Sequence, residues 1–220
     1  MIKGILFNTD MVRAILDGRK TVTRRICKDA NEFNVPDMSY FDADRRTYAV
    51  HNYSDSEHAE QLSTAERTCP ICPGDILYVR ETWCGWHLPH GELLYRYKAT
   101  DPNGNKTPKG PEYDEEWEVI PWRPSIHMPK AAARIWLKVT DVRVERLEDI
   151  TDEQAKAEGA NWKNGKNVGW EEKMRRTAID RFAELWNSTI KKSDLDRYGW
   201  DASPWVWVIE FERCEKPEEV

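Results

Sequence analysis

Short strand-like runs outnumber helical patterns in this chain, and the two do not alternate regularly. The strand-like runs span residues 3–7, 76–79, 92–99, 132–147 and 204–214. A parallel, doubly wound sheet needs a helix after nearly every strand, and this chain does not supply one. The order therefore predicts an α+β protein, and it favours a small mixed β-barrel with flanking helices over a doubly wound sheet.

The first helix signal lies near the start of the chain, in the stretch DMVRAILDG. Asn8 or Thr9 is suited to cap its N-terminus, and apolar residues recur along it at helical spacing. Gly18 is placed to end the helix as the residue after the C-cap. A strongly basic stretch, DGRKTVTRRI at residues 17–26, therefore directly follows a helix end.

Two further helices are expected in the second half of the chain. Thr151 and Gln154 match a capping box, and Gly159 matches a C-terminal stop. A longer helix is expected over residues 171–190 because four apolar side chains share one face there. These are Ile179, Phe182, Leu185 and Trp186.

Polar, turn-rich segments interrupt these elements. Residues 28–68 carry little hydrophobic periodicity, so we expect an inserted, partly irregular segment there. A second insertion is expected at 101–121, of which the turn-rich residues 101–116 are expected to form a surface loop. A third insertion is expected at 160–172. The whole chain, residues 1–220, is expected to be one domain that carries these insertions.

The composition narrows the class of partner. The 220 residues carry a net charge of -6, which argues against a broad electrostatic clamp on duplex nucleic acid but leaves room for a local basic patch. No apolar run approaches the roughly 18 residues that a membrane helix needs, and the N-terminus lacks the pattern of a signal peptide. We therefore expect a cytoplasmic protein with no membrane partner.

The five cysteines suit a reducing compartment, because an odd number does not make a disulfide framework. Cys69 and Cys72 form a C-x-x-C, to which Cys27, His51 or His58 would have to add further zinc ligands. A second closely spaced pair is missing from the sequence. We expect no metal at these cysteines, and no other motif calls for a cofactor.

The basic stretch has two interpretations from composition alone. Lys20 and Thr23 stand three residues apart, so on a regular strand their side chains would face opposite sides. One interpretation is a solvated charged loop. The other is a functional site, which requires a turn between residues 19 and 23 if both side chains act together.

Three blocks of the sequence resemble the ASCH domain, a member of the PUA-like barrel superfamily. These are LDGRKTVTRR, PGDILYVRETW and LEDITDEQAKAEG, in this order, and WRPSIHMP and PWVWVIEF are similar to further segments of the larger phage and prophage-type members. The resemblance implies a PUA-like mixed β-barrel with a cleft beside the first helix. It also implies a link to RNA or modified nucleosides.

A smaller bacterial member of this family is an N(4)-acetylcytidine amidohydrolase, and the resemblance implies a catalytic set of Lys20, Thr23 and Glu158. A threonine hydroxyl is a weak nucleophile until a base takes its proton. Lys20 suits this task if burial or neighbouring cations lower its pKa. Glu158 lies at the end of its expected helix, where the helix dipole disfavours an anion, and this suits a general acid.

Other side chains are candidates for substrate binding, with a modified nucleoside or single-stranded RNA as the expected partner. Cations beside the catalytic set would either lower the pKa of Lys20 or contact a ribose or phosphate, and residues of the other matching blocks would line the pocket. These candidates are Arg19, Arg24, Arg25, Glu81, Trp83, Trp122 and His127. The chain has 11 Trp, and core packing is favoured over base stacking for most of them.

The resemblance leaves three functions open. The first is an amidohydrolase that removes an acyl group from a modified cytidine. The second is a module that binds RNA or modified nucleotides without turnover, and the third is a ribonuclease. A binding module for an extended RNA would lose affinity steeply with salt, whereas a nucleoside site would hardly respond.

Overall fold

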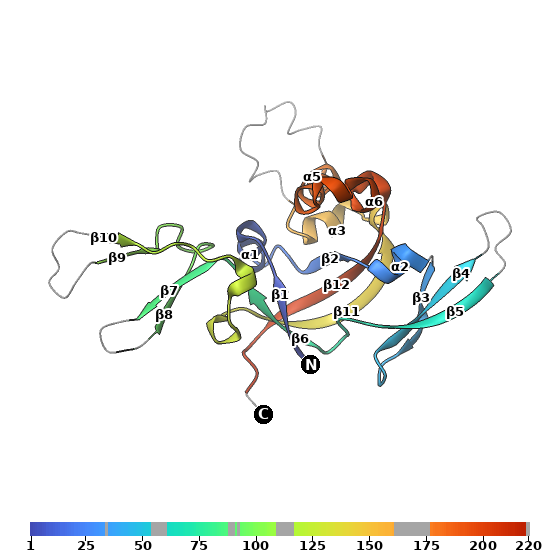
Figure 1. Cartoon of the computed structure of the whole chain (residues 1–220), viewed down its shortest axis with the longest axis horizontal. Coiled ribbons are helices and arrows are strands. Elements are labelled where there is room, and N and C mark those ends of the chain that lie inside the picture. Colours follow the sequence, from blue (N-terminus) through green and yellow to red (C-terminus); the bar gives the residue numbers. More distant parts are fainter. Residues whose placement is uncertain are drawn as a thin grey trace. The chain divides into compact units, whose positions relative to one another are not determined.

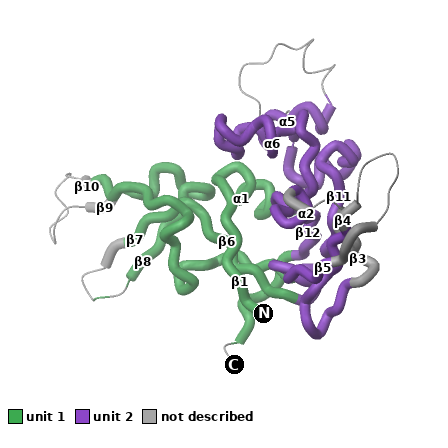
Figure 2. The backbone as a smooth tube through the Cα atoms, turned by 45° about the vertical axis from the view of Figure 1, so that its right-hand side comes forward, with its two compact units in different colours: residues 1–18, 75–138, 213–220 green, residues 19–74, 139–212 purple. Residues whose placement is uncertain are grey.

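The structure is a computed structural model, and it describes residues 1–33, 35–53, 61–87, 91, 93–108, 117–160 and 177–218. The chain divides into two compact units, which are coloured separately in Figure 2. Unit 1 consists of residues 1–18, 75–138 and 213–220, and unit 2 consists of residues 19–74 and 139–212. The expectation of one domain stays a prediction.

Strands and helices are combined in the α+β class, as the sequence predicted (Figure 1). A five-stranded mixed sheet has the order β1-β6-β11-β12-β2. β1 pairs with β6 in parallel, whereas β6 pairs with β11 and β12 pairs with β2 in antiparallel fashion. No closed barrel is formed by the strands of the described ranges, so the PUA-like barrel stays a prediction.

Unit 1 contains the first helix and most of the middle of the chain. The predicted cap is confirmed, because the Asn8 side chain accepts a hydrogen bond from the backbone N–H of Met11. Gly18 follows the helix with φ +71°, a conformation that suits glycine. The elements are β1 (Ile2–Leu6), α1 (Thr9–Leu16), β6 (Ile76–Arg80), β7 (Trp83–His87), β8 (Leu93–Tyr97), β9 (Lys106–Pro108), β10 (Trp117–Val119), η1 (Ser125–His127) and η2 (Lys130–Ala132).

Unit 2 contains the basic stretch and the other predicted helices. Both ends of α3 are as predicted, since the Thr151 and Gln154 capping box forms and Gly159 has φ +86°. The elements are β2 (Val22–Ile26), α2 (Lys28–Phe33), β3 (Val35–Asp42), β4 (Thr47–Tyr53), β5 (Gln61–Thr68), η3 (Leu147–Asp149), α3 (Asp152–Ala157), α5 (Ala178–Thr189), η5 (Lys192–Asp194), α6 (Leu195–Tyr198) and η6 (Trp200–Ala202). β11 (Trp136–Arg146) and β12 (Trp205–Cys214) contribute residues to both units.

The expectation of a partly irregular segment at residues 28–68 has to be corrected for the described part of this segment. It forms α2 and an antiparallel three-stranded sheet of order β3-β4-β5. Cross-strand hydrogen bonds hold this sheet, so its strands do not need the apolar runs by which strands are recognised in a sequence. Tyr48 on β4 is buried against the ring of Trp207, with centroids 4.9 Å apart.

The other two expected insertions lie partly outside the described residues. Within 101–121, the short strands β9 and β10 pair with each other, and residues 109–116 are outside the described ranges. The expected insertion at 160–172 falls almost wholly outside them. The helix expected at 171–190 begins at Ala178 in the structure, where Thr177 and Asp180 form a capping box.

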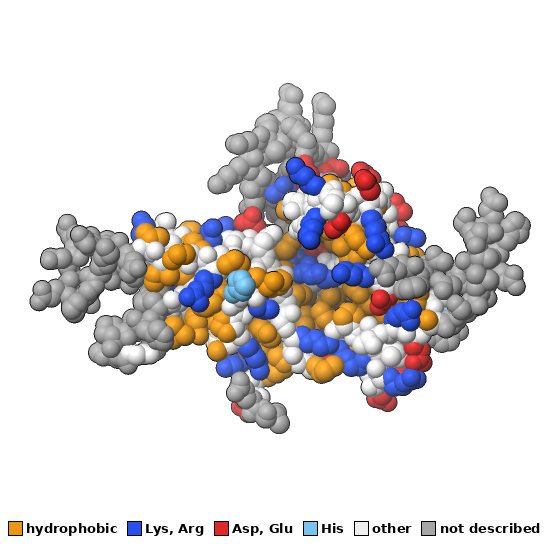
Figure 3. Space-filling model, in the orientation of Figure 1, with side chains coloured by type: hydrophobic (Ala, Val, Ile, Leu, Met, Phe, Trp, Pro, Cys, Tyr) orange, Lys and Arg blue, Asp and Glu red, His pale blue; other side chains and the backbone are white. Residues whose placement is uncertain are grey.

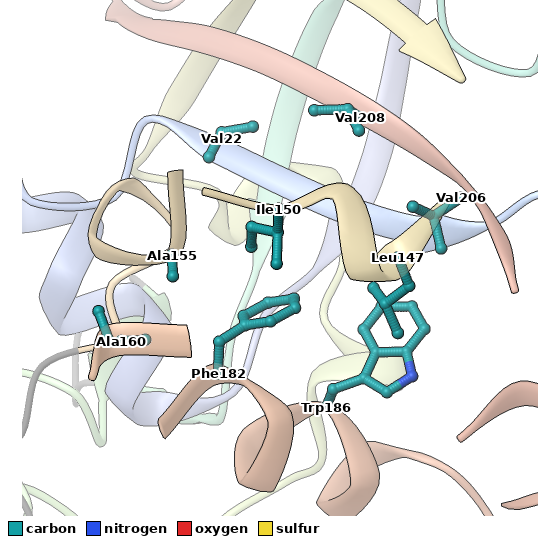
Figure 4. Close-up of a cluster of buried hydrophobic side chains, with 10 residues drawn as sticks. Val22, Leu147, Ile150, Ala155, Ala160, Phe182, Trp186, Val206 and Val208 are labelled. Atoms are coloured by element: carbon teal, nitrogen blue, oxygen red, sulfur yellow. The ribbon is translucent and has the colours of Figure 1, made fainter. Parts of the chain in front are cut away.

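A buried apolar cluster supports unit 2 (Figure 4). Phe182 and Trp186 point from α5 toward side chains of β2, α3 and β12. The cluster comprises Val22, Leu147, Ile150, Ala155, Ala160, Ala178, Phe182, Trp186, Val206 and Val208. Val22 lies between Lys20 and Thr23 in sequence, so burial of its side chain fixes which way the neighbouring side chains of β2 face.

Among the helices in the described ranges, none has the length and apolar character needed to cross a membrane.

Candidate functional site

The candidate catalytic residues of unit 2 lie where β2 meets the end of α3. Lys20 and Glu158 form an isolated antiparallel bridge, and the backbone N–H of Thr21 donates to the carbonyl of Ala157 at 2.9 Å. Glu158 is the C-cap residue of α3, and the turn at Gly159 ends the helix there. The capping signals read from the sequence therefore place Glu158 beside the strand.

Lys20 makes its strongest contact with the Glu158 carboxylate. Its Nζ donates to Glu158 Oε2 at 2.5 Å, to the Glu158 carbonyl at 3.0 Å and to the Val22 carbonyl at 2.7 Å. Lys20 is 2% exposed and Glu158 is 4% exposed. Two residues that are 138 positions apart thus form a buried ion pair.

Burial is the main cause that lowers the pKa of Lys20. The carboxylate of Glu158 opposes this shift, while the cations of Arg25 and Arg24 add to it. A lysine with a lowered pKa supplies more neutral amine at a given pH, and neutral amine is the form that accepts a proton. The environment of Lys20 is therefore suited to a base.

Thr23 lies on β2, where its side chain contacts Arg25. Side chains alternate along a strand, so Val22 and Arg24 share one face while Thr23 and Arg25 share the other. The Thr23 hydroxyl is fully buried and accepts a hydrogen bond from Arg25 Nη1 at 2.9 Å. The structure brings Lys20 and Glu158 together, but it places the Thr23 hydroxyl on Arg25.

Two of the expected substrate-binding cations lie near the ion pair. Arg24 is buried, and its Nη1 donates to Glu158 Oε1 at 3.4 Å. Arg25 is half-buried beside Thr23. Arg19 is also half-buried in unit 2. Arg24 therefore contacts protein carboxylates, whereas the sequence suggested a contact with substrate.

Glu81 is buried in unit 1, where it forms an ion pair with Arg134. The two Glu81 oxygens accept from Arg134 Nε at 2.9 Å and Nη2 at 3.0 Å. The guanidinium also lies over the ring of Tyr97, at 4.1 Å from the centroid. This two-point contact is the geometry typical of a structural arginine–carboxylate pair.

Trp83, Trp122 and His127 are the other candidates in unit 1. Trp83 is buried against Met128 and Ala132, and the guanidinium of Arg123 lies 5.2 Å from its ring centroid. Trp122 is half-exposed, and His127 is exposed within η1. Trp83 therefore belongs to a small core, while Trp122 and His127 face solvent at least in part.

The cysteine motif is buried in unit 2. Cys69 Sγ donates to the carbonyl of Ile71 at 2.8 Å, and burial raises the pKa of this thiol to about 12. Among the described residues, no three potential metal-ligating side chains gather at one place. His58 lies outside those residues, and the expectation of no zinc stays a prediction.

A surface depression of about 350 Å³ lies beside α5 and α6. Its lining combines two carboxylates, one amide, one indole and one leucine with a glycine and an alanine. It is formed by Asn187, Leu195, Asp196, Gly199, Trp200, Asp201 and Ala202. None of the candidates read from the sequence is among these residues.

The sequence missed the residues that surround the ion pair. Glu145 on β11 and Gln154 on α3 both accept from Arg24. Gln154 was recognisable as part of a capping box, but its second contact was not. Glu145 occupies a polar position in a strand whose residues alternate between apolar and polar, and this pattern does not indicate which side chain Glu145 contacts.

Comparison of the chain with protein-family models, curated proteins and solved structures found no match.

Proposed function

We propose that this protein is an ASCH-type amidohydrolase that removes an acyl group from the exocyclic amine of a modified cytidine-type nucleoside. The observation that carries the proposal is the buried contact of 2.5 Å between Lys20 Nζ and Glu158 Oε2. These residue types at these positions are the ones that the ASCH resemblance implies for the base and the acid. The lowered pKa of Lys20 supports its role as a base.

In the proposed reaction, the Thr23 hydroxyl attacks the carbonyl carbon of the amide, and Lys20 takes the hydroxyl proton. The bond between this carbon and the exocyclic nitrogen breaks, and the proton that Lys20 has taken passes through the Glu158 carboxylate to the leaving nitrogen. Water then hydrolyses the acyl-threonine ester, which releases the carboxylic acid and restores the Thr23 hydroxyl. Cytidine and one carboxylic acid are the products.

The geometry adds two requirements to this scheme. The Thr23 hydroxyl contacts Arg25, so it must turn toward Lys20 before it attacks. All three catalytic side chains are buried, so the substrate must also gain access to them. For these reasons the test measures substrate binding and turnover separately.

The test uses N(4)-acetylcytidine and follows the release of acetate and cytidine. The variants Thr23→Ala, Lys20→Ala and Glu158→Gln should each lower kcat far more than they change KM, because each removes an interaction made mainly in the transition state. For Glu158→Gln the loss should be about 10²- to 10⁴-fold, the usual range for general acid–base catalysis.

Matched controls come from exposed neighbours of the same residue types. Thr21→Ala, Lys28→Ala and Glu153→Gln change exposed side chains near the site and should leave kcat unchanged. If the wild-type protein releases no acid from any acylated cytidine, the amidohydrolase proposal is wrong.

The second candidate is a module that binds RNA or modified nucleotides without turnover. Complete burial of Thr23 favours it, because a buried hydroxyl is poorly placed to attack a substrate. Figure 3 shows Lys and Arg side chains over α5, α6 and β2, with Asp and Glu side chains among them over the helices. Binding to single-stranded RNA that weakens steeply with salt, without any acid release, would support this candidate over the enzyme.

A further inference from the structure

Arg24 occupies a buried position at which its guanidinium meets three acceptors. Its side chain is 0% exposed. Nη1 donates to Glu158 Oε1 at 3.4 Å, and Nη2 donates to Glu145 Oε2 at 3.3 Å and to Gln154 Oε1 at 2.9 Å. The guanidinium carbon lies 5.9 Å from the ring centroid of Phe182. This surrounding leaves Arg24 no surface on which to receive a substrate.

The Glu158 carboxylate is shared between two cations. Lys20 contacts Oε2, and Arg24 contacts Oε1. A carboxylate held at one oxygen is free to rotate about that contact, whereas contacts at both oxygens fix its plane. Arg24 therefore restrains the oxygen that Lys20 does not hold.

Arg24 is itself restrained from two sides. Gln154 lies four residues before Glu158 and also accepts from the backbone N–H of Thr151 at 3.1 Å, so the helix cap and the arginine share one amide oxygen. On the other side, Glu145 accepts from Arg143, which in turn donates to Glu210 at 2.5 Å. Positively and negatively charged side chains thus alternate along a series of contacts that runs from Lys20 through Arg24 to β11 and β12.

We propose that Arg24 is a positioning residue, which fixes the Glu158 carboxylate against the Lys20 amine and does not bind substrate. The proposal rests on the amidohydrolase function proposed above. Lysine in this position would keep the charge, but its single ammonium cannot span Glu158, Glu145 and Gln154 together as a planar guanidinium does. The two roles of Arg24, geometry and charge, are therefore separable by substitution.

The test compares Arg24→Lys with Arg24→Gln. Arg24→Lys should lower kcat by about 10²-fold, the loss typical of a catalytic group displaced by about 1 Å, and should change KM little. The pH at which the rate is half-maximal should stay unchanged, because the cation beside Lys20 remains. Arg24→Gln should lower kcat as well and should move this midpoint to higher pH, because one cation that lowers the pKa of Lys20 is gone.

Charged groups from α3 and β2 act on the Lys20 amine. These are the Glu158 carboxylate from α3 and the Arg24 and Arg25 cations from β2. Arg181 on α5 contacts Glu184 at 3.1 Å and supplies the matched control. Arg181→Lys and Arg181→Gln should change neither kcat nor the pH midpoint.

A second measurement keeps the proposal independent of turnover. The Lys20 amine is titrated by NMR in the wild type, in Arg24→Lys and in Arg24→Gln, and only Arg24→Gln should raise its pKa. If the Arg24 variants do not fold, Glu145→Gln loosens the same guanidinium and should lower kcat by a smaller factor. Wild-type protein without hydrolysis overturns the proposed function, and the NMR titration still tests whether the charge of Arg24 acts on Lys20.

Two results would contradict the positioning role of Arg24 even if the protein is an amidohydrolase. One is wild-type kcat in Arg24→Lys and Arg24→Gln. The other is a large rise in KM with unchanged kcat, which would make Arg24 a substrate-binding residue.

Discussion

Lys20 Nζ lies 2.5 Å from Glu158 Oε2, although the two residues are 138 positions apart in sequence. Both side chains are almost fully buried, and Arg24 contacts the second oxygen of the same carboxylate. Removal of one member of such a group leaves an uncompensated charge in the interior, which is costly. A substitution at this position is therefore expected to change both the proposed catalysis and the free energy of unfolding.

The stability of the protein should rise with pH in the alkaline range because of Lys20. Its pKa is lowered from 10.5 in the folded state, so between the lowered value and 10.5 the unfolded chain binds the proton more tightly. The free energy of unfolding should increase as pH rises through this window. Urea unfolding at several pH values should show that Lys20→Met loses this increase, while Lys28→Met keeps it.

Glu158→Gln should extend the same window to lower pH, while its upper end at 10.5 stays in place. Glu158 is the group that raises the pKa of Lys20 against the effect of burial, so without its charge the pKa should fall further. NMR titration of the Lys20 amine measures this shift directly. An unchanged or higher midpoint would contradict the assigned contact.

The helix cap of α3 should matter for Lys20, whereas the cap of α5 should not. Thr151→Ala and Thr177→Ala each remove one capping box and should each cost about 1 kcal/mol of stability. Only Thr151→Ala disturbs the helix that ends at Glu158. Thermal unfolding measures the loss of stability that both variants share. The pKa of Lys20 should change only in Thr151→Ala.

The Glu81–Arg134 pair should stabilise unit 1. Glu81 is buried, so Arg134→Ala leaves a buried carboxylate without its partner and should cost about 3 kcal/mol. Adding Glu81→Gln to this variant should recover part of the loss, because the buried charge is then removed. Denaturant unfolding checks both. A loss within about 0.5 kcal/mol, as for surface pairs, would show that Glu81 is not held as described.

Cys69 should react slowly with alkylating reagents in the folded protein. Its pKa is raised to about 12 by burial, so little thiolate exists at about pH 8, and the thiolate is the reactive form. Cys214 is half-exposed and should be labelled first. Mass spectrometry of the labelled protein gives the order in which the cysteines react.

Elemental analysis of the purified protein should find no zinc, and about one zinc per chain would instead indicate a metal site at Cys69 and Cys72.

Helix ends were predictable from the sequence because local hydrogen bonds decide them. Asn8 caps α1, Gly18 follows it, and Thr151 with Gln154 begins α3 as expected. Each of these signals involves residues within one helical turn of each other. The α+β class was also predictable, because it depends on the order of short apolar runs.

The sheet formed by β3, β4 and β5 was not predictable in this way. Tyr48, Ala49 and Val50 are buried, but this apolar run is only three residues long and lies between Thr47 and His51. A strand held by cross-strand hydrogen bonds depends on partners elsewhere in the chain, which hydrophobic periodicity does not report.

The candidate site was likewise predictable only in part from the sequence. The sequence, through its resemblance to the ASCH domain, named Lys20, Thr23 and Glu158, but it assigned Arg24 to substrate. Only the tertiary structure decided that Arg24 contacts Glu158 and that the Thr23 hydroxyl faces Arg25. The physical reason is that strand alternation sets which face a side chain occupies, whereas the groups that meet it there come from α3 and β11, more than a hundred positions away.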